Sequence, residues 1–136
     1  MMKIRLSFAQ VIIHSDHLAE VIVDHNVLVT LEMCERLDQL WVETFDKPFA
    51  LLINRINHYS LTYEAKLSIA SLEQQVATAI VIYHCQGAND ANKFIASRRA
   101  DNLNVRQFDG LQQGYQQAFT WLDSQLELIS EPYYRD

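Results

Sequence analysis

The chain has 136 residues, 49% of them hydrophobic and 21% charged, which is ordinary for one globular domain and excludes a disordered chain. Its formal net charge of −6 repels a phosphate backbone on average, so we expect no nucleic-acid partner. No apolar run approaches the length of a bilayer, and no charged start followed by an apolar stretch marks a secretory signal. We therefore expect a cytoplasmic protein without a membrane span.

The first elements are predicted to be extended. Residues 3–8 alternate polar and apolar side chains, which is the period of a half-buried strand. The apolar runs 11–13 and 18–23 flank the polar segment 14–17, so we predict an antiparallel hairpin. Polar side chains gather at this hairpin and the next turn, namely His14, Asp16, His17, Asp24 and His25. No third ligand follows His14 and His17 at a diagnostic spacing, so we expect turn residues and no metal site.

The pattern then changes to a helical period. Thr30 is placed to cap a first helix. Its apolar stripe consists of Leu31, Cys34, Leu37, Trp41 and Phe45. The continuous apolar run 49–53 predicts a strand covered on both faces. Ser60 is placed to cap a second helix. The stripe of that helix consists of Leu61, Ala65, Ile69, Leu72 and Val76.

The last third is predicted to contain two strands and two helices. Residues 77–83 and 103–108 form the strands. A weaker helix between them contains Ala91, Phe94 and Ile95. Asp109 opens a final helix. Its stripe consists of Leu111, Tyr115, Ala118, Phe119, Leu122 and Leu126. We expect the tail 131–136 to be loosely held.

Strands that alternate with helices predict a single α/β domain over residues 1–136. Its sheet is mixed, with an N-terminal antiparallel hairpin and about four helices. Cys34 and Cys85 show no CxxC spacing, and we expect free thiols in a reducing compartment. Gly87 and Gly110 are single glycines that do not make a phosphate-cradling loop, so we expect no cofactor.

Ligands of open α/β sheets bind beyond the carboxyl ends of the strands. This rule selects the loops 54–60 and 84–90 and the corner 108–110. The candidate binding residues are Asn54, Arg55, Asn57, His58, Ser60, His84, Asn89 and Asp90. Ser60 has two interpretations, a helix cap or a hydroxyl that accepts a phosphoryl group at a helix N-terminus.

The same loops contain the residues of a conceivable nucleophile pair. Adjacent residues at a strand end point to opposite faces, so His84 and Cys85 do not pair with each other. His58 in the neighbouring loop is the candidate base for Cys85. Glu32 and Glu35 are expected on the solvated face of their helix, and no acid–base dyad is recognisable. We therefore predict no catalytic residues and no enzymatic activity.

The order of elements resembles the STAS and SpoIIAA-like superfamily. The hairpin, the helix after Thr30, the strand 49–53 and the helix begun by Ser60 follow that order. The ending Val-Arg-Gln-Phe-Asp-Gly-Leu at 105–111, followed by Phe-Thr-Trp-Leu at 119–122, is similar to the close of those proteins. The resemblance implies a four-helix, mixed-sheet domain used in partner switching or ligand sensing.

The resemblance also implies a role for one serine. In the anti-anti-sigma members, a kinase partner phosphorylates a serine within an Asp-Ser-Ser/Thr-Gly motif at the start of the second helix. The matching stretch 57–61 keeps Ser60 but lacks the aspartate, the paired hydroxyl residue and the glycine. The chain therefore resembles the uncharacterised bacterial SpoIIAA-like proteins without the motif, and Ser60 is a positional analogue.

Three functions remain open from the sequence. The first is a non-catalytic regulatory or interaction domain that binds a protein partner or a small ligand at the carboxyl edge of the sheet. The second is a carrier of lipid or another apolar molecule, which a cavity of roughly 300 Å³ or more between the helices and the sheet would favour. The third is a small enzyme that uses Cys85 with His58. A homodimer is also expected from aromatic surface at Trp41, Trp121, Tyr133 and Tyr134.

Overall fold

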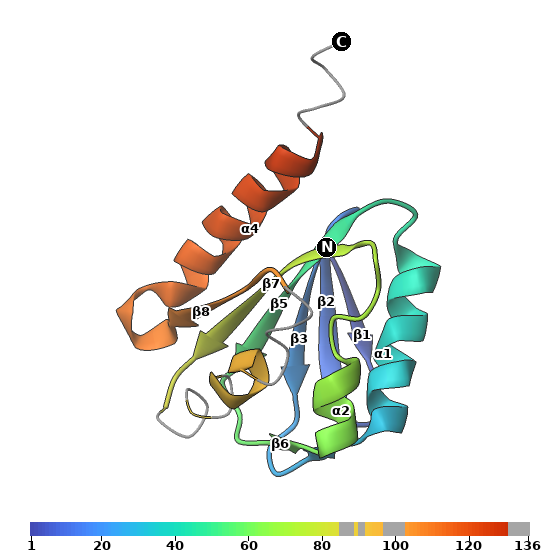
Figure 1. The fold of residues 1–136 in the computed structure, drawn as a ribbon, viewed down its shortest axis with the longest axis vertical. Coiled ribbons are helices and arrows are strands. Elements are labelled where there is room, and N and C mark those ends of the chain that lie inside the picture. Colours follow the sequence, from blue (N-terminus) through green and yellow to red (C-terminus); the bar gives the residue numbers. More distant parts are fainter. Residues whose placement is uncertain (85–88, 90–91, 97–102, 131–136) are drawn as a thin grey trace.

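The computed structural model describes residues 1–84, 89, 92–96 and 103–130. Within them, six strands form one sheet in the order β1-β2-β3-β5-β7-β8 (Figure 1). The bounds are β1 Met2–Arg5, β2 Ala9–Ser15, β3 Leu18–Val23, β5 Phe49–Arg55, β7 Gln75–Ile82 and β8 Val105–Asp109. The first three strands pair antiparallel, and the rest continue parallel to β3. The predicted mixed α/β fold with an N-terminal antiparallel hairpin is confirmed.

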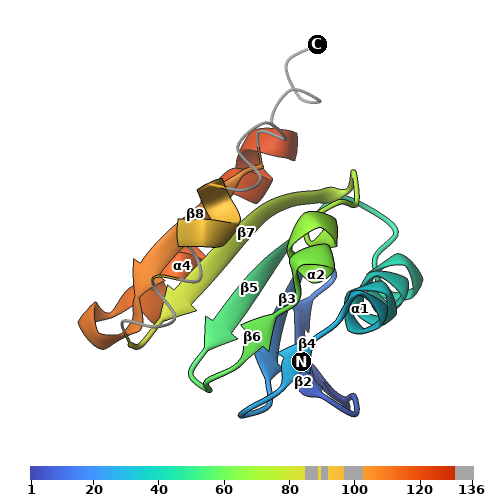
Figure 2. The same ribbon diagram turned by 60° about the horizontal axis from the view of Figure 1, so that its bottom comes forward.

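Helices cover both faces of the sheet (Figure 2). Helices α1 (Leu31–Thr44) and α2 (Tyr63–Ser68) lie on one face, and α4 (Gly114–Ser130) lies on the other. Residues 92–96 are helical as well. Because side chains alternate along a strand, neighbours in sequence belong to different cores. On β5, Leu51 packs in the α1 core and Leu52 in the α4 core.

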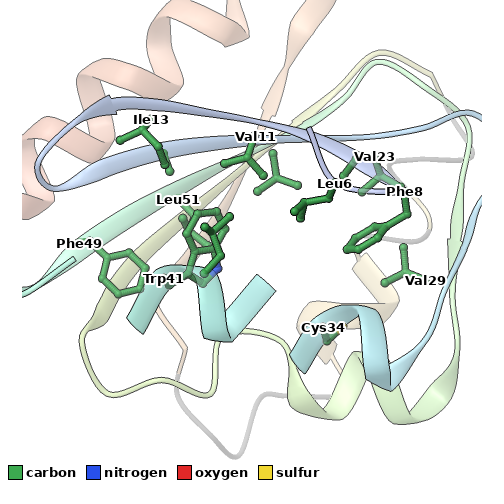
Figure 3. Packing of buried hydrophobic residues seen from close by; sticks show 14 of the residues in the cluster. Leu6, Phe8, Val11, Ile13, Val23, Val29, Cys34, Trp41, Phe49 and Leu51 are labelled. Carbon is green, nitrogen blue, oxygen red and sulfur yellow. The ribbon is translucent and has the colours of Figure 1, made fainter. Parts of the chain in front are cut away.

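Helix α1 forms as predicted. The Thr30 hydroxyl accepts a hydrogen bond from the Met33 amide at 3.3 Å, which is an N-cap. The helix buries Cys34, Leu40 and Trp41. Figure 3 shows Trp41 near Phe49 and Leu51, and the Trp41 and Phe49 ring centroids are 6.3 Å apart. Phe49 also stacks on Phe45, the residue that ends α1, with ring centroids 4.6 Å apart, so aromatic contacts hold α1 on the sheet.

Helix α2 starts later and is shorter than predicted. Ser60 does not cap it, because Ser60 lies in the short strand β6 (Ser60–Leu61), which pairs with β4 (Leu28–Val29). The cap is Thr62, whose hydroxyl accepts from the Ala65 amide at 3.1 Å. The helical stripe was wrong beyond Ser68. Ala70 adopts a left-handed φ of 61°, which stops a helix, and β7 begins at Gln75.

Substitutions at the two hydroxyls distinguish a cap from a strand residue. Thr62→Ala is expected to lower the free energy of unfolding by about 1 kcal/mol, because it leaves the Ala65 amide without its acceptor. Ser60→Ala, at an exposed side chain, is expected to change it by less than about 0.5 kcal/mol. Urea unfolding of both variants measures the difference. A larger loss at Ser60 would contradict the assignment.

The turn before α4 also differs from the prediction. Asp109 caps a single 3-10 turn, η2 (Gly110–Gln112), by accepting from the Leu111 amide at 2.9 Å. Gln113 then adopts a left-handed φ of 66°, and α4 begins at the next residue. Leu111 is consequently 71% exposed and is not part of the helix stripe. The predicted stripe residues Ala118, Leu122 and Leu126 are buried against the sheet.

Cys34 is a free, buried cysteine, as predicted, and burial raises the pKa of its thiol. Cys85 and the predicted loose tail 131–136 lie outside the described residues. None of the described helices is long and apolar enough to cross a membrane.

Candidate functional site

A histidine follows the carboxyl end of each of three neighbouring parallel strands. His25 follows β3, His58 lies in the loop after β5, and His84 lies just beyond β7. The rings of His25 and His58 meet edge to face with centroids 5.8 Å apart. The rings of His58 and His84 stack, with centroids 3.9 Å apart and planes 22° apart. We call these three residues the histidine row.

One backbone and one side-chain hydrogen bond hold the first two loops together. The Asn26 amide donates to the His58 carbonyl at 2.6 Å, and the Asn57 side-chain amide donates to the Val23 carbonyl at 3.0 Å. Asn26 has a left-handed φ of 63°, a conformation that asparagine tolerates better than most residues. His25 and His58 are thus positioned by loops that are bonded to each other, although both side chains are exposed.

A groove of about 320 Å³ opens beyond the carboxyl ends of β7 and β8. Its lining includes Tyr83, His84, Gln107, Phe108, Asp109 and Leu111. His84 therefore belongs both to the histidine row and to the groove. Its position agrees with the rule that ligands of open α/β sheets bind beyond the carboxyl ends of parallel strands.

Gly110 makes room for one wall of the groove. A Cβ at this position would lie 2.4 Å from Cε2 of the Tyr83 ring, so a side chain there displaces the ring. Burial, together with the Glu20 carboxylate, raises the pKa of the Tyr83 hydroxyl. Tyr83 therefore stays neutral at physiological pH and presents an aromatic face with a hydroxyl group.

The predicted candidate residues separate in the structure. His58 and His84 meet, and Asn57 braces their loop, but Asn54 and Arg55 are buried on opposite faces of the sheet. Ser60 and Asn89 are exposed, and Asp90 lies outside the described residues.

Arg55 points into the α1 core. Its guanidinium is over the Tyr59 ring, 4.1 Å from the centroid, and Nη2 donates to the Tyr59 carbonyl at 2.7 Å. Arg55 is only 3% exposed, so burial removes it from the surface of the carboxyl edge. Asn54 and Arg55 were predicted to lie in a loop, whereas both belong to β5, in which successive side chains face opposite sides of the sheet.

A buried carboxylate occupies the α4 face. Glu20, on β3, is 1% exposed. Its Oε1 accepts from the Tyr115 hydroxyl at 2.7 Å and lies 2.9 Å from His14 Nε2, while Oε2 accepts from the Asn54 amide at 2.9 Å. With His14 protonated at Nε2, all three neighbours donate to the carboxylate, which compensates for its burial.

This network joins the sheet to α4. Tyr115 lies in the first turn of α4, and the His14 ring meets Phe119 of the same helix edge to face at 5.0 Å. Burial and the nearby Glu20 carboxylate raise the pKa of Tyr115, so its hydroxyl remains a donor. This network was not predicted from the sequence. The signal for it is Glu20 itself, an acid within the apolar run 18–23 of a buried strand.

A second, partly open space lies between α1 and the sheet, beside the residues that precede and follow α2. It has a volume of about 90 Å³, and its lining includes Val21, Leu37, Asp38, Trp41, Leu51 and Arg55. Asp38, midway along α1, is half-buried. Burial and the neighbouring Glu35 carboxylate raise its pKa to about 6. We call this space the α1 cavity.

The raised pKa of Asp38 predicts a pH-dependent cost. The folded protein binds this proton more tightly than the unfolded chain, so ionisation destabilises the fold above about pH 6, and the cost disappears below about pH 4. Asp38→Asn should therefore raise the free energy of unfolding, relative to the native sequence, by about 1–3 kcal/mol more near pH 8 than near pH 4. Urea unfolding at both pH values measures this difference. An equal effect at both would contradict it.

The side chains of the hairpin do not assemble a reactive set. His14 faces α4, whereas His17 Nδ1 lies 2.6 Å from Ser15 Oγ and 3.6 Å from Asp16 Oδ1. Ser15 and Asp16 thus both approach Nδ1 of His17. In a catalytic triad, the serine and the acid contact different nitrogens of the histidine ring. Among the described residues, no group of three or more histidine, cysteine or acidic side chains is arranged to hold a metal.

Comparisons of the chain with protein-family models, with curated proteins and with solved structures gave no match. The geometry of the histidine row, the groove and the α1 cavity is therefore what discriminates between candidate functions.

Proposed function

We propose that the chain is a non-catalytic regulatory domain of SpoIIAA-like fold that binds a small planar ligand at the carboxyl edge of its sheet. The observation that carries the proposal is the groove of about 320 Å³ that opens beside the stacked rings of His58 and His84. This volume falls within the range of about 300–1,000 Å³ that is typical of small-molecule pockets. It therefore favours a small ligand over a protein partner.

The lining indicates the kind of ligand. Tyr83 and Phe108 supply aromatic surface, and the His84 ring extends that surface toward His58. Stacked aromatic pairs add about 0.5–1.5 kcal/mol beyond the area that they bury. Gln107 and Asp109 supply polar groups at the groove, which would fix the orientation of a planar molecule with hydrogen-bonding groups at its edge.

The SpoIIAA-like assignment is supported by the order of elements, a hairpin followed by α1, β5, α2 and parallel strands, with α4 last. Ser60 is exposed but lies in β6, two residues before the cap of α2, so a helix N-terminus does not support it as a phosphoryl acceptor. The proposal therefore rests on ligand binding and not on phosphorylation.

The lipid-carrier alternative is less well supported. The α1 cavity, at about 90 Å³, is well below the roughly 300 Å³ that a lipid or drug-sized molecule needs. Its lining comes from α1, the sheet and the residues next to α2, whereas the apolar stripe of α4 packs on the opposite face.

A fragment screen tests the proposal. Planar heteroaromatic fragments are screened by ligand-observed NMR, and each hit is titrated against His58→Ala and His84→Ala. Loss of a stacking partner is expected to weaken binding about tenfold in either variant. His17→Ala is the matched control, because His17 is a partly exposed histidine in the β2–β3 hairpin at the opposite edge of the sheet. Hits that bind all variants equally would contradict the proposal.

A further inference from the structure

The α1 cavity combines apolar walls with a carboxylate. Val21, Leu51 and Trp41 provide apolar surface, and the side chain of Asp38 reaches the same space from α1 (Figure 3 labels Trp41 and Leu51 within the same core). About 10–15 Å³ of such space is the least that holds one water, so about 90 Å³ leaves room for a ligand of only a few non-hydrogen atoms. A ligand of this size is a short aliphatic molecule with one polar group.

The charges of the lining decide which polar group suits the cavity. Asp38 has no hydrogen bond or ion pair within the described part of the chain. A cation in contact with it would lower its pKa, whereas the net effect of its surroundings is to raise it. A cationic ligand can therefore pair with the half-buried Asp38 carboxylate without displacing an existing partner.

The other titratable groups around the cavity do not pair with Asp38. Arg55, at the carboxyl end of β5, has its guanidinium over the Tyr59 ring and bonded to the Tyr59 carbonyl. Cys34 lies one turn before Asp38, and burial raises the pKa of its thiol, which keeps it neutral. Glu35 adds negative charge from the same helix. The effects that act on Asp38 are therefore burial and one negative charge, and no cation is among them, although the charged Arg55 guanidinium also lines the cavity.

We propose that the α1 cavity is a binding site for a small aliphatic ammonium ion, with the alkyl chain against Trp41 and Leu51 and the ammonium group on Asp38. The rings of Trp41 and the side chain of Leu51 complement such a ligand, because they remove its alkyl chain from water while Asp38 meets the charge. This site is separate from the groove beside the histidine row, and the proposal does not depend on the function proposed for that groove.

Titrations with a cation and its neutral isostere test the site. Native protein is titrated near pH 8 with n-propylammonium and with n-propanol, and binding is followed by the Trp41 indole signal in nitrogen-15 NMR spectra. The ammonium is expected to bind at least about fivefold more tightly than the alcohol, which is the effect of one partly buried ion pair. This preference should shrink as the pH falls below about 6 and Asp38 becomes protonated.

Two variants on α1 separate the site from a general charge effect. Asp38→Asn is expected to bind n-propylammonium and n-propanol equally, and its retained binding of the alcohol shows that the cavity is intact. Glu35→Gln removes the neighbouring acid, which is exposed and does not line the cavity, and should keep a preference within about twofold of the native value. The proposal is overturned if neither probe binds, if both bind native protein equally, or if Asp38→Asn retains the preference.

Discussion

Glu20→Ala is expected to lower the free energy of unfolding by about 3–5 kcal/mol. The substitution leaves the Tyr115 hydroxyl, His14 Nε2 and the Asn54 amide without their shared acceptor, at a position where Glu20 is 1% exposed. It also removes the carboxylate through which α4 is bonded to β3, next to its partners on β2 and β5. Chemical denaturation near neutral pH measures the loss.

Two companion variants identify the cause. Glu20→Gln keeps the shape but turns an amide group toward hydrogen-bond donors, and a loss of about 1–3 kcal/mol is expected. Glu43→Ala removes an exposed acid on α1, whose single described bond is to Gln39, and should cost less than about 0.5 kcal/mol. If Glu20→Ala were as mild as Glu43→Ala, the carboxylate would not be the buried link to α4.

Leu122→Ala is the second variant with a large expected effect. Leu122 is fully buried between α4 and the sheet, in the cluster that contains Leu52, Ala79 and Val81. Truncation removes apolar contacts and leaves a cavity in a rigid layer, and such substitutions cost about 3–5 kcal/mol. Thermal and urea unfolding should report the loss together.

The matched control lies on the same helix. Leu128 is 58% exposed, so Leu128→Ala changes the same side chain with little loss of packing and should cost less than about 0.5 kcal/mol. Equal effects of the two substitutions would contradict the docking of α4 through the stripe that includes Leu122 and Leu126.

The fold was predictable where side-chain periodicity is long and uninterrupted. The alternation of the hairpin, the stripe after Thr30 and the stripe that contains Ala118, Leu122 and Leu126 each specify one element. The stripe beyond Ser68 misled, because Ile69 and Leu72 are partly buried at helical spacing without being helical. These side chains are buried by contacts with the α1 core and not by a helix of their own. The two-residue strands β4 and β6 are too short to show a period.

The sequence predicted where the candidate site lies in the sheet, but not all of the residues that form it. The rule for the carboxyl ends of parallel strands selected His58 and His84, which stack in the structure. His25 was missed as their neighbour, because only the strand order β3-β5-β7 shows that three loops meet. Asp38 was missed because an acid on an amphipathic helix usually faces solvent, and its burial depends on how α2 packs beside α1.

A protein-observed chemical-shift map tests the central claim most directly. Uniformly nitrogen-15-labelled protein is titrated with the tightest planar fragment, and the amide shifts are followed residue by residue. Binding at the carboxyl edge predicts the largest shifts at His25, His58, Tyr83, His84 and Asp109. Largest shifts at the opposite edge, around His17 and Lys47, would contradict a ligand site at the histidine row.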